Sequence, residues 1–381
     1  MDWLVIPTNH TRAHFPLSIA KGHAFCNRTK ELAKLEQWIQ QRRPILLISP
    51  RRHGKTSLAL QAITNTGLPY AHLDFFSIID ETDIERIILK GVAHLISQIG
   101  STTQKALRLA NKIFEGTNVK VALSTFGIEV DIQRNQQKPA FRILEILERV
   151  EVLAEQAKTP LVLFFDEFQC IEQITESNAI EAVLRQVAQL TDAIAFVFSR
   201  SNRHLLQQLF EDRNKPFYKL CEKISLERID ANAYIKHIQI AAQQTWKKPL
   251  TTPALDRIFL CTDRHPYYLN LLCSRLLDET TLPDEKTVDA IWQQYIQEER
   301  SNVASELELF SKNQKKLLTV IAREGSIEAP LGNAFVNLAN MSKTTIAQAL
   351  RFLEQRDYIY KDSAGTIRVL DPLIYAVLQS T

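Results

Sequence analysis

The chain lacks the marks of secreted, zinc-binding and serine-hydrolase proteins. Its five cysteines form no C-x-x-C pair, and their odd number leaves no complete disulfide framework. We therefore expect reduced, mostly buried thiols in a cytoplasmic protein. The nine histidines show no metal-ligand spacing, and no G-x-S-x-G segment predicts a nucleophile elbow.

Long apolar runs and a strong net charge are also missing. No run of about 18 apolar residues occurs, and the amino terminus has no signal-peptide pattern, so we expect no membrane partner. The formal net charge is +3 over 381 residues, of which 45% are hydrophobic and 23% charged. This composition is typical of a folded protein of two or three domains. Contact with nucleic acid would have to depend on a local basic patch.

The most informative segment of the sequence is a loop between an apolar strand at 45–48 and a helical pattern. The loop and the first helical residues are Ser49, Pro50, Arg51, Arg52, His53, Gly54, Lys55, Thr56 and Ser57. Backbone N–H groups at a helix start attract phosphate oxygens. Lys55 supplies a mobile positive charge and Thr56 a hydroxyl for Mg²⁺. The segment predicts a phosphate-binding loop; the alternative is a surface turn rich in Arg and Lys.

A second element follows in the expected order. The apolar run 161–165 ends in Asp166 and Glu167, and such a run is typical of a strand buried on both faces. Because the carboxyl ends of parallel strands carry ligands, we expect Asp166 to reach Mg²⁺ and Glu167 to polarise an attacking water. The alternative is that this acidic pair caps the next helix.

Alternating patterns predict a parallel α/β core over residues 22–230. Further strands are expected at about 70–76, 193–198 and 223–226, and helices at about 28–39, 83–99, 139–157 and 177–190. Residues 104–136 are less regular, but 119–123 and 127–131 alternate as a β-hairpin would. Residues 1–21 are expected to form an arm lying on this first domain.

After Asp230 the strand patterns stop. Residues 231–304 predict a small domain of amphipathic helices broken by prolines. Residues 305–381 predict a winged helix, in which Ser342 caps the helix 343–353 and two strand-like runs flank residues 363–365.

Five motifs in chain order resemble those of the archaeal-type ATPases, a branch of the STAND and AAA+-related P-loop NTPases. They lie at residues 25–32, 50–57, 165–169, 201–206 and 265–269. The likeness spans roughly residues 22–380. It implies a three-layer α/β/α core of the ASCE type with strand order 5-1-4-3-2, a helical lid domain, and a carboxyl-terminal winged helix.

The resemblance also implies roles for residues outside the loop. The residues implied to lie near the adenine are Phe25, Cys26 and Arg28. The polar sensors of the γ-phosphate are implied to be Ser199, Ser201 or Asn202. The implied lid motif, which closes over the nucleotide, is His265 and Pro266.

The sequence departs from the family pattern at three positions, where Asn27, Ser49 and Arg200 replace the usual glycine. Ser49 is tolerable if its φ is negative, because a Cβ is strongly penalised only at positive φ. Arg200 introduces a large cation beside the implied sensor. We expect its side chain to point to solvent; the alternatives are a contact with phosphate or a weakened hydrolytic activity.

The predicted winged helix contains residues that are suited to bind DNA. Lys343, Thr344, Thr345, Gln348 and Arg351 are of types that read bases and phosphates. Residues 305–381 hold nine Lys and Arg against eight Asp and Glu, and nine minus eight gives +1. A net charge this small attracts the phosphates of DNA only weakly. A protein-contact or autoinhibitory role and a DNA-binding role both remain open.

The leading hypothesis is an ATP-binding switch that hydrolyses ATP slowly with Mg²⁺. The first alternative is an ATP-bound DNA-binding regulator or initiator, and the second is a degenerate ATPase that serves as an interaction scaffold. The expected partners are ATP or ADP, an unidentified protein, and DNA through the winged helix. The sequence leaves open whether the protein forms an oligomer.

Overall fold

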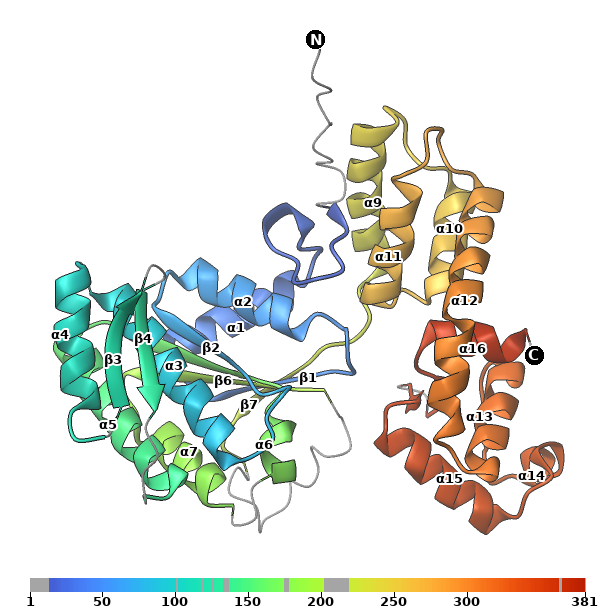
Figure 1. The fold of residues 1–381 in the computed structure, drawn as a ribbon. Coiled ribbons are helices and arrows are strands. Elements are labelled where there is room, and N and C mark those ends of the chain that lie inside the picture. The colour runs from blue at the N-terminus through green and yellow to red at the C-terminus, as the bar shows by residue number, and fades with distance from the viewer. Residues whose placement is uncertain are drawn as a thin grey trace. The chain divides into compact units, whose positions relative to one another are not determined.

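The computed structural model describes residues 14–100, 102–117, 119–124, 127–132, 137–174, 178–201, 219–362 and 365–380. They form two compact units (Figure 1). The first, here called the sheet unit, comprises Arg28–Arg51 and Lys55–Leu226; the second, the helical unit, comprises the described part of Met1–Asn27, Arg52–Gly54 and Glu227–Thr381. The predicted domain boundaries at 21, 230 and 304 stay predictions.

A five-stranded parallel sheet forms the centre of the sheet unit. Its strands are β1 (Ile45–Ile48), β2 (Tyr70–Asp74), β5 (Leu161–Asp166), β6 (Ile194–Arg200) and β7 (Glu222–Ser225). Their spatial order is β2-β5-β6-β1-β7, and every neighbouring pair is parallel. This order confirms the predicted 5-1-4-3-2 arrangement. All residues of β1, β5 and β6 are buried, as their uninterrupted apolar runs require.

Helices cover both faces of this sheet and complete the predicted three layers. They are α1 (Thr29–Gln40), α2 (Lys55–Thr66), α3 (Glu81–Ile99), α4 (Thr103–Phe114), α5 (Pro139–Ala157), α6 (Gln169–Ile174) and α7 (Ala179–Leu190). Helices α1 and α2 lie on one face, and α3, α5 and α7 lie on the other (Figure 1). The predicted hairpin is confirmed as β3 (Val119–Ser124) and β4 (Gly127–Ile132).

Helix α4 was not predicted. It occupies part of the stretch 104–136 whose pattern had looked irregular. Thr102 caps it by accepting a hydrogen bond from the N–H of Lys105, and the helix buries Ala106, Ala110 and Phe114. These residues and Ile113 recur at helical spacing, so the periodic pattern of this helix was present in the sequence and was not recognised.

The helical unit begins with four helices and continues with the winged helix. The first four are α9 (Ala231–Thr245), α10 (Thr252–Thr262), α11 (Pro266–Leu276) and α12 (Glu285–Glu308). The winged helix consists of α13 (Lys312–Glu324), α14 (Asn333–Ala339), α15 (Lys343–Gln355), β8 (Ile359–Lys361), β9 (Ile367–Val369) and α16 (Pro372–Gln379). Ser342 caps α15 as predicted, since its Oγ accepts from Thr345 N at 3.2 Å. The final helix α16 was not predicted.

The described part of the amino-terminal arm, residues 14–21, packs within the helical unit. Phe15 is 2% exposed and belongs to the helical unit's core. Asn270 Nδ2 donates to Pro16 O at 3.0 Å, and His237 Nε2 lies 3.1 Å from His14 O. Residues 14–21 therefore group with the helical unit and not, as expected, with the first domain, because residues of α9 and α11 bind their backbone and bury the ring of Phe15. The rest of the predicted arm lies outside the described residues.

Among the described helices, none combines the length and the apolar character that crossing a bilayer requires.

Candidate functional site

The predicted phosphate loop connects β1 to α2, and two of its residues have left-handed backbones. Gly54 has φ 88° and Arg52 has φ 61°. Ser49 is not among the positive-φ residues of the described chain, so its Cβ carries no left-handed backbone penalty. Asn27 has φ 58°, and asparagine tolerates this left-handed conformation better than most residues other than glycine.

Lys55, the first residue of α2, turns its side chain back over the loop. Its Nζ donates to Ser49 O at 3.2 Å, Ser49 Oγ at 3.3 Å and Pro50 O at 3.3 Å. The residue is 5% exposed. A buried ammonium held by carbonyl and hydroxyl oxygens at the start of a 12-residue helix is suited to bind phosphate oxygens.

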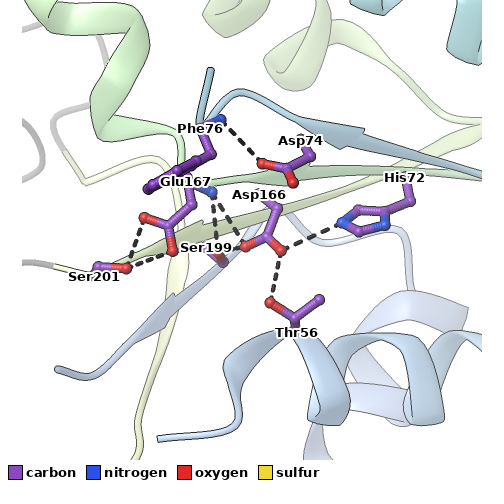
Figure 2. A network of polar contacts seen from close by, with 8 residues as sticks. All are labelled: Thr56, His72, Asp74, Phe76, Asp166, Glu167, Ser199 and Ser201. Atoms are coloured by element: carbon purple, nitrogen blue, oxygen red, sulfur yellow. Dashed lines mark hydrogen bonds and ion pairs between the residues drawn. The ribbon is translucent and has the colours of Figure 1, made fainter. Parts of the chain in front are cut away.

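Thr56 and Asp166 meet at the carboxyl edge of the sheet (Figure 2). Thr56 Oγ1 donates to Asp166 Oδ2 at 2.6 Å, and His72 Nε2 lies 3.3 Å from the same oxygen. Ser199 Oγ donates to the other carboxylate oxygen of Asp166. Asp166 and Ser199 come together because Asp166 is the last residue of β5, and Ser199 lies at the end of the neighbouring strand β6.

The pKa of Asp166 is lowered despite its burial. The residue is 4% exposed, and this desolvation alone would raise the pKa of the carboxyl group. The hydrogen bonds from His72, Ser199 and Thr56, together with the charge of His72, outweigh burial and hold the pKa below its usual value. Asp166 is therefore an anion at neutral pH.

This donor set fits Mg²⁺. Among the described residues, no group of three or more His, Cys, Asp and Glu could hold a metal ion by itself. A hydroxyl and a carboxylate, Thr56 and Asp166, are instead the ligands expected for Mg²⁺, which binds through one or two carboxylates together with phosphate oxygens of its substrate. The two residues thus fit a Mg²⁺ ion that binds together with a nucleotide, and their role as its ligands stays a prediction.

Glu167 lies beside Asp166 and is partly exposed. Its backbone is left-handed, with φ 53°, and its N–H donates to Asp166 Oδ1 at 3.1 Å. Ser201 Oγ lies 2.6 and 2.7 Å from the two carboxylate oxygens of Glu167 (Figure 2), and the Gln169 amide donates to Oε2. A fixed carboxylate with access to solvent can orient a water molecule.

The structure brings Ser199 and Ser201 to this edge, but it does so as partners of the acidic pair. Their hydroxyls bind Asp166 and Glu167 respectively. Their predicted role as sensors of the γ-phosphate stays a prediction. Asn202, the third predicted sensor, lies outside the described residues.

The expectation for Arg200 was wrong. Its side chain is fully buried, because β6 continues to Arg200, two residues beyond its predicted end, and Arg200 pairs with Ile48 of β1. Ser49 N also lies 3.5 Å from Arg200 O. The arginine is thus part of the sheet beneath the site and does not point to solvent.

The residues implied near the adenine divide between the two units. Phe25 and Cys26 belong to the helical unit, where Cys26 Sγ lies 3.8 Å from Ala233 O. Arg28 belongs to the sheet unit, is 6% exposed, and pairs with Glu31 at 3.3 Å. Their contacts with an adenine stay predictions.

The lid motif starts α11, with His265 as N-cap and Pro266 as first residue. Two residues of the loop, Arg52 and His53, group with the same unit. The His53 and His265 rings meet edge to face, with their centroids 4.6 Å apart, and the Arg52 guanidinium lies 4.1 Å from the centroid of the Tyr267 ring.

The pKa of His265 is lowered well below its usual value. The largest cause is burial, followed by the charges of His53, Arg228 and Arg52. Its imidazole is neutral at physiological pH.

Two polar residues of the site were missed by sequence reasoning. His72 binds Asp166, and Gln169 binds Glu167. The alternation along β2 could have found His72, because His72 and Asp74 share one face at the end of a predicted strand. Gln169 lies in the motif at 165–169, but no role was assigned to it, because its contact with Glu167 depends on the turn after β5.

Two family models match this chain. Residues 25–272 match the model of an ATPase domain found predominantly in Archaea, and residues 303–380 match that of a probable winged helix domain. No curated protein sequence matches the chain.

Two solved structures show the same fold. A Walker-type ATPase of Pyrococcus abyssi has 16% identity and a TM-score of 0.69, with 96% of this chain and 99% of that chain covered. The ORC2 protein of Aeropyrum pernix, solved in ADPNP–ADP complexes, has 15% identity and a TM-score of 0.55, with 93% and 92% covered.

Proposed function

Since this chain belongs to the family of ATPase domains found predominantly in Archaea, we propose that it is an ATP-binding switch that hydrolyses ATP slowly with Mg²⁺. The observation that carries the proposal is the 2.6 Å contact between Thr56 of the loop and Asp166 of β5. It joins the phosphate loop to the acidic pair at the edge of a parallel sheet, which is where such sheets bind ligands.

Each residue at this edge has a separate task in the proposal. Lys55 and the loop residues Ser49 to Gly54 hold the phosphates, while Thr56 and Asp166 hold Mg²⁺. Glu167 orients the attacking water, and Ser199, Ser201 and Asn202 respond to the γ-phosphate. When bound, Mg²⁺ neutralises charge that develops on the phosphate oxygens.

The nucleotide also needs partners away from the phosphates. We assign the adenine to Phe25, Cys26 and Arg28, and closure over the nucleotide to His265 and Pro266. The contacts of Arg52 and His53 with α11 support this assignment, because residues of the phosphate loop then share surroundings with the lid motif. A nucleotide that changes these contacts would bias the state of the helical unit, which is what a switch requires.

Binding and turnover by three variants test the proposal. We expect Lys55→Ala to lose ATP binding, and Glu167→Gln to keep binding while turnover falls by about 10²–10⁴-fold, the usual contribution of a positioned base. Lys30→Ala removes an exposed lysine from α1 and serves as the control for Lys55→Ala. Unchanged turnover in Glu167→Gln would exclude the proposed route. A wild-type protein that binds no nucleotide would favour the scaffold hypothesis.

A second candidate function is DNA binding through α15, either as a regulator or as an initiator. The observation that favours it is the exposed face of this helix, which presents Lys343, Thr344, Gln348 and Arg351 and no acidic side chain. Half-buried Glu354 lies 3.9 Å from Lys361 of β8. The face is therefore locally basic although residues 305–381 are nearly neutral.

DNA affinity measured at several salt concentrations tests this candidate. If both cations contact phosphates, the double variant Lys343→Ala and Arg351→Ala should lower the slope of log K against log salt by about 2. The matched control is Lys286→Ala with Arg300→Ala, two exposed cations of α12. Equal slopes for the two double variants would exclude α15 as the DNA contact.

A further inference from the structure

Glu167 is held by two residues that close a ring with it. Ser201 Oγ donates to both Glu167 oxygens at 2.6 and 2.7 Å. The Gln169 amide nitrogen donates to Glu167 Oε2, and Gln169 Oε1 accepts the Ser201 N–H at 3.4 Å. We call these three residues the Glu167 clamp. It links the turn after β5 to the end of β6.

The turn that carries Glu167 and Gln169 is held by backbone hydrogen bonds and by aromatic packing. Phe168 N donates to Ser199 O at 3.0 Å, and Cys170 N donates to Glu167 O at 2.9 Å. The Phe168 ring is fully buried and lies 4.9 Å from that of Phe198. Gln169 and Ser201 are 5% and 2% exposed, whereas Glu167 is partly exposed. The two residues that hold Glu167 are thus buried, whereas Glu167 itself keeps part of its surface exposed to solvent.

The two oxygens of Glu167 are not equivalent. Oε2 accepts from both Gln169 and Ser201, while Oε1 shares the single hydroxyl proton of Ser201. A carboxylate oxygen has about two lone-pair sites, so, with respect to the residues that the structure describes, Oε1 keeps capacity for one more donor. Resting on the function proposed above, we propose that Gln169 and Ser201 are positioning residues that leave Oε1 as the oxygen to which the attacking water donates.

Gln169→Met tests this role, because it removes the amide at nearly constant volume. We expect kcat for ATP to fall by about 10–100-fold, a part of what a positioned base contributes, while the Kd for ATP changes by less than about twofold. Gln98→Met is the matched control. Gln98 also bridges two elements, through Tyr70 O at 2.7 Å and Tyr70 N at 3.1 Å, but at the opposite end of β2.

A double-mutant cycle separates positioning from general structural damage. If Gln169 acts through Glu167, then Gln169→Met should add less than about twofold in a Glu167→Gln background. A full additional loss there, or an unchanged kcat in the single variant, would overturn the proposal. Ser201→Thr keeps the hydroxyl and is expected to retain kcat better than Ser201→Ala.

Crystal structures of the nucleotide-free wild type and of Gln169→Met provide a readout without activity. We expect the Glu167 carboxylate between Ser201 and Gln169 in the wild type and displaced or spread over several rotamers in the variant. An unmoved carboxylate in Gln169→Met would overturn the clamp. A wild type with this geometry but without ATP turnover would instead contradict the proposed hydrolysis and leave the positioning of Glu167 standing.

Discussion

Each unit contains an aspartate that accepts hydrogen bonds from several groups, but the pKa values of the two aspartates are shifted in opposite directions. Asp166 in the sheet unit accepts from Thr56, Ser199 and His72. Asp371 in the helical unit accepts from the Tyr268 hydroxyl at 2.7 Å and caps α16 through two backbone N–H groups. The pKa of Asp166 is lowered, whereas that of Asp371 is raised.

The difference comes from burial and from the charges nearby. Burial is the largest influence on both carboxyl groups and raises the pKa of each. At Asp166 the added charge comes from His72 and favours the anion, but at Asp371 it comes from Glu306 and opposes the anion. Hydrogen bonds alone therefore do not decide the state of a buried carboxyl group. Asp166 is therefore an anion beside Thr56, whereas Asp371 joins α11 to α16 through Tyr268.

A third buried acid, Glu85, is paired with Arg142, and loss of this pair should give the largest effect on stability. It is fully buried on α3, and its Oε2 lies 2.5 Å from Arg142 of α5; burial, which outweighs Arg142 and Arg86, raises the pKa of its carboxyl group. We expect Arg142→Met to destabilise the protein by about 3–5 kcal/mol, because a buried acid loses its partner. The double variant with Glu85→Leu should recover much of that loss. Urea denaturation measures both, and a double variant no more stable than the single one would contradict this view.

Replacing each aspartate by asparagine separates their roles. Asp166→Asn should lower ATP turnover by about 100-fold or more, because a neutral amide is a poor ligand for Mg²⁺. Asp371→Asn should leave turnover within about twofold, since an asparagine still caps α16. Turnover measured across a Mg²⁺ titration checks both. Comparable losses in the two variants would mean that Asp371 also supports the active site.

Removing one hydroxyl donor tests the helical unit further. Tyr268→Phe should destabilise α16 by about 1–2 kcal/mol, because the carboxyl group of Asp371 loses one of its partners. The change is measurable as faster hydrogen exchange in residues 372–379. Tyr375→Phe, on α16 itself, removes a hydroxyl that contacts Gln379 and serves as the control. Equal exchange in Tyr268→Phe and the wild type would show that the tyrosine contact is not needed.

The opposite pKa shifts predict opposite responses to pH. Because the pKa of Asp166 is lowered in the fold, its stabilising contribution is complete above the ordinary value of 3.8 and is lost as pH falls through the folded pKa. The pKa of Asp371 is raised, so its contribution is complete below 3.8 and is lost as pH rises through the folded pKa. Hydrogen exchange of β5 and α16, corrected for intrinsic rates, should therefore respond with opposite sign. Asp371→Asn should abolish the response of α16.

An exposed ion pair should give the smallest effect. Arg43 and Glu222 lie 2.9 Å apart, and their side chains are 51% and 44% exposed. Solvent screening limits such pairs to about 0–1 kcal/mol, so Arg43→Gln should change the urea midpoint little. A loss as large as that of Arg142→Met would show that burial does not control these energies.

Local patterns predicted much of the fold. The apolar runs at 45–48 and 161–165 indicated buried parallel strands, and Ser342 indicated a helix start, because these signals depend on neighbours in the chain. Helices α4, α6 and α16 were not predicted. The loop and the acidic pair were recognised because their chemistry requires particular residues at particular spacings.

The sequence by itself determined that Lys55, Thr56, Asp166 and Glu167 would lie near the carboxyl ends of parallel strands. Only the tertiary structure decided which groups surround them. His72 reaches Asp166 because β2 and β5 are neighbours, and Gln169 and Ser201 meet at Glu167 because β6 lies beside β5. Arg200 is buried for a similar reason, since β6 pairs with β1 to its last residue. Pairing between strands far apart in the chain has no local signal, so the partners of each acid emerge only when the sheet is assembled.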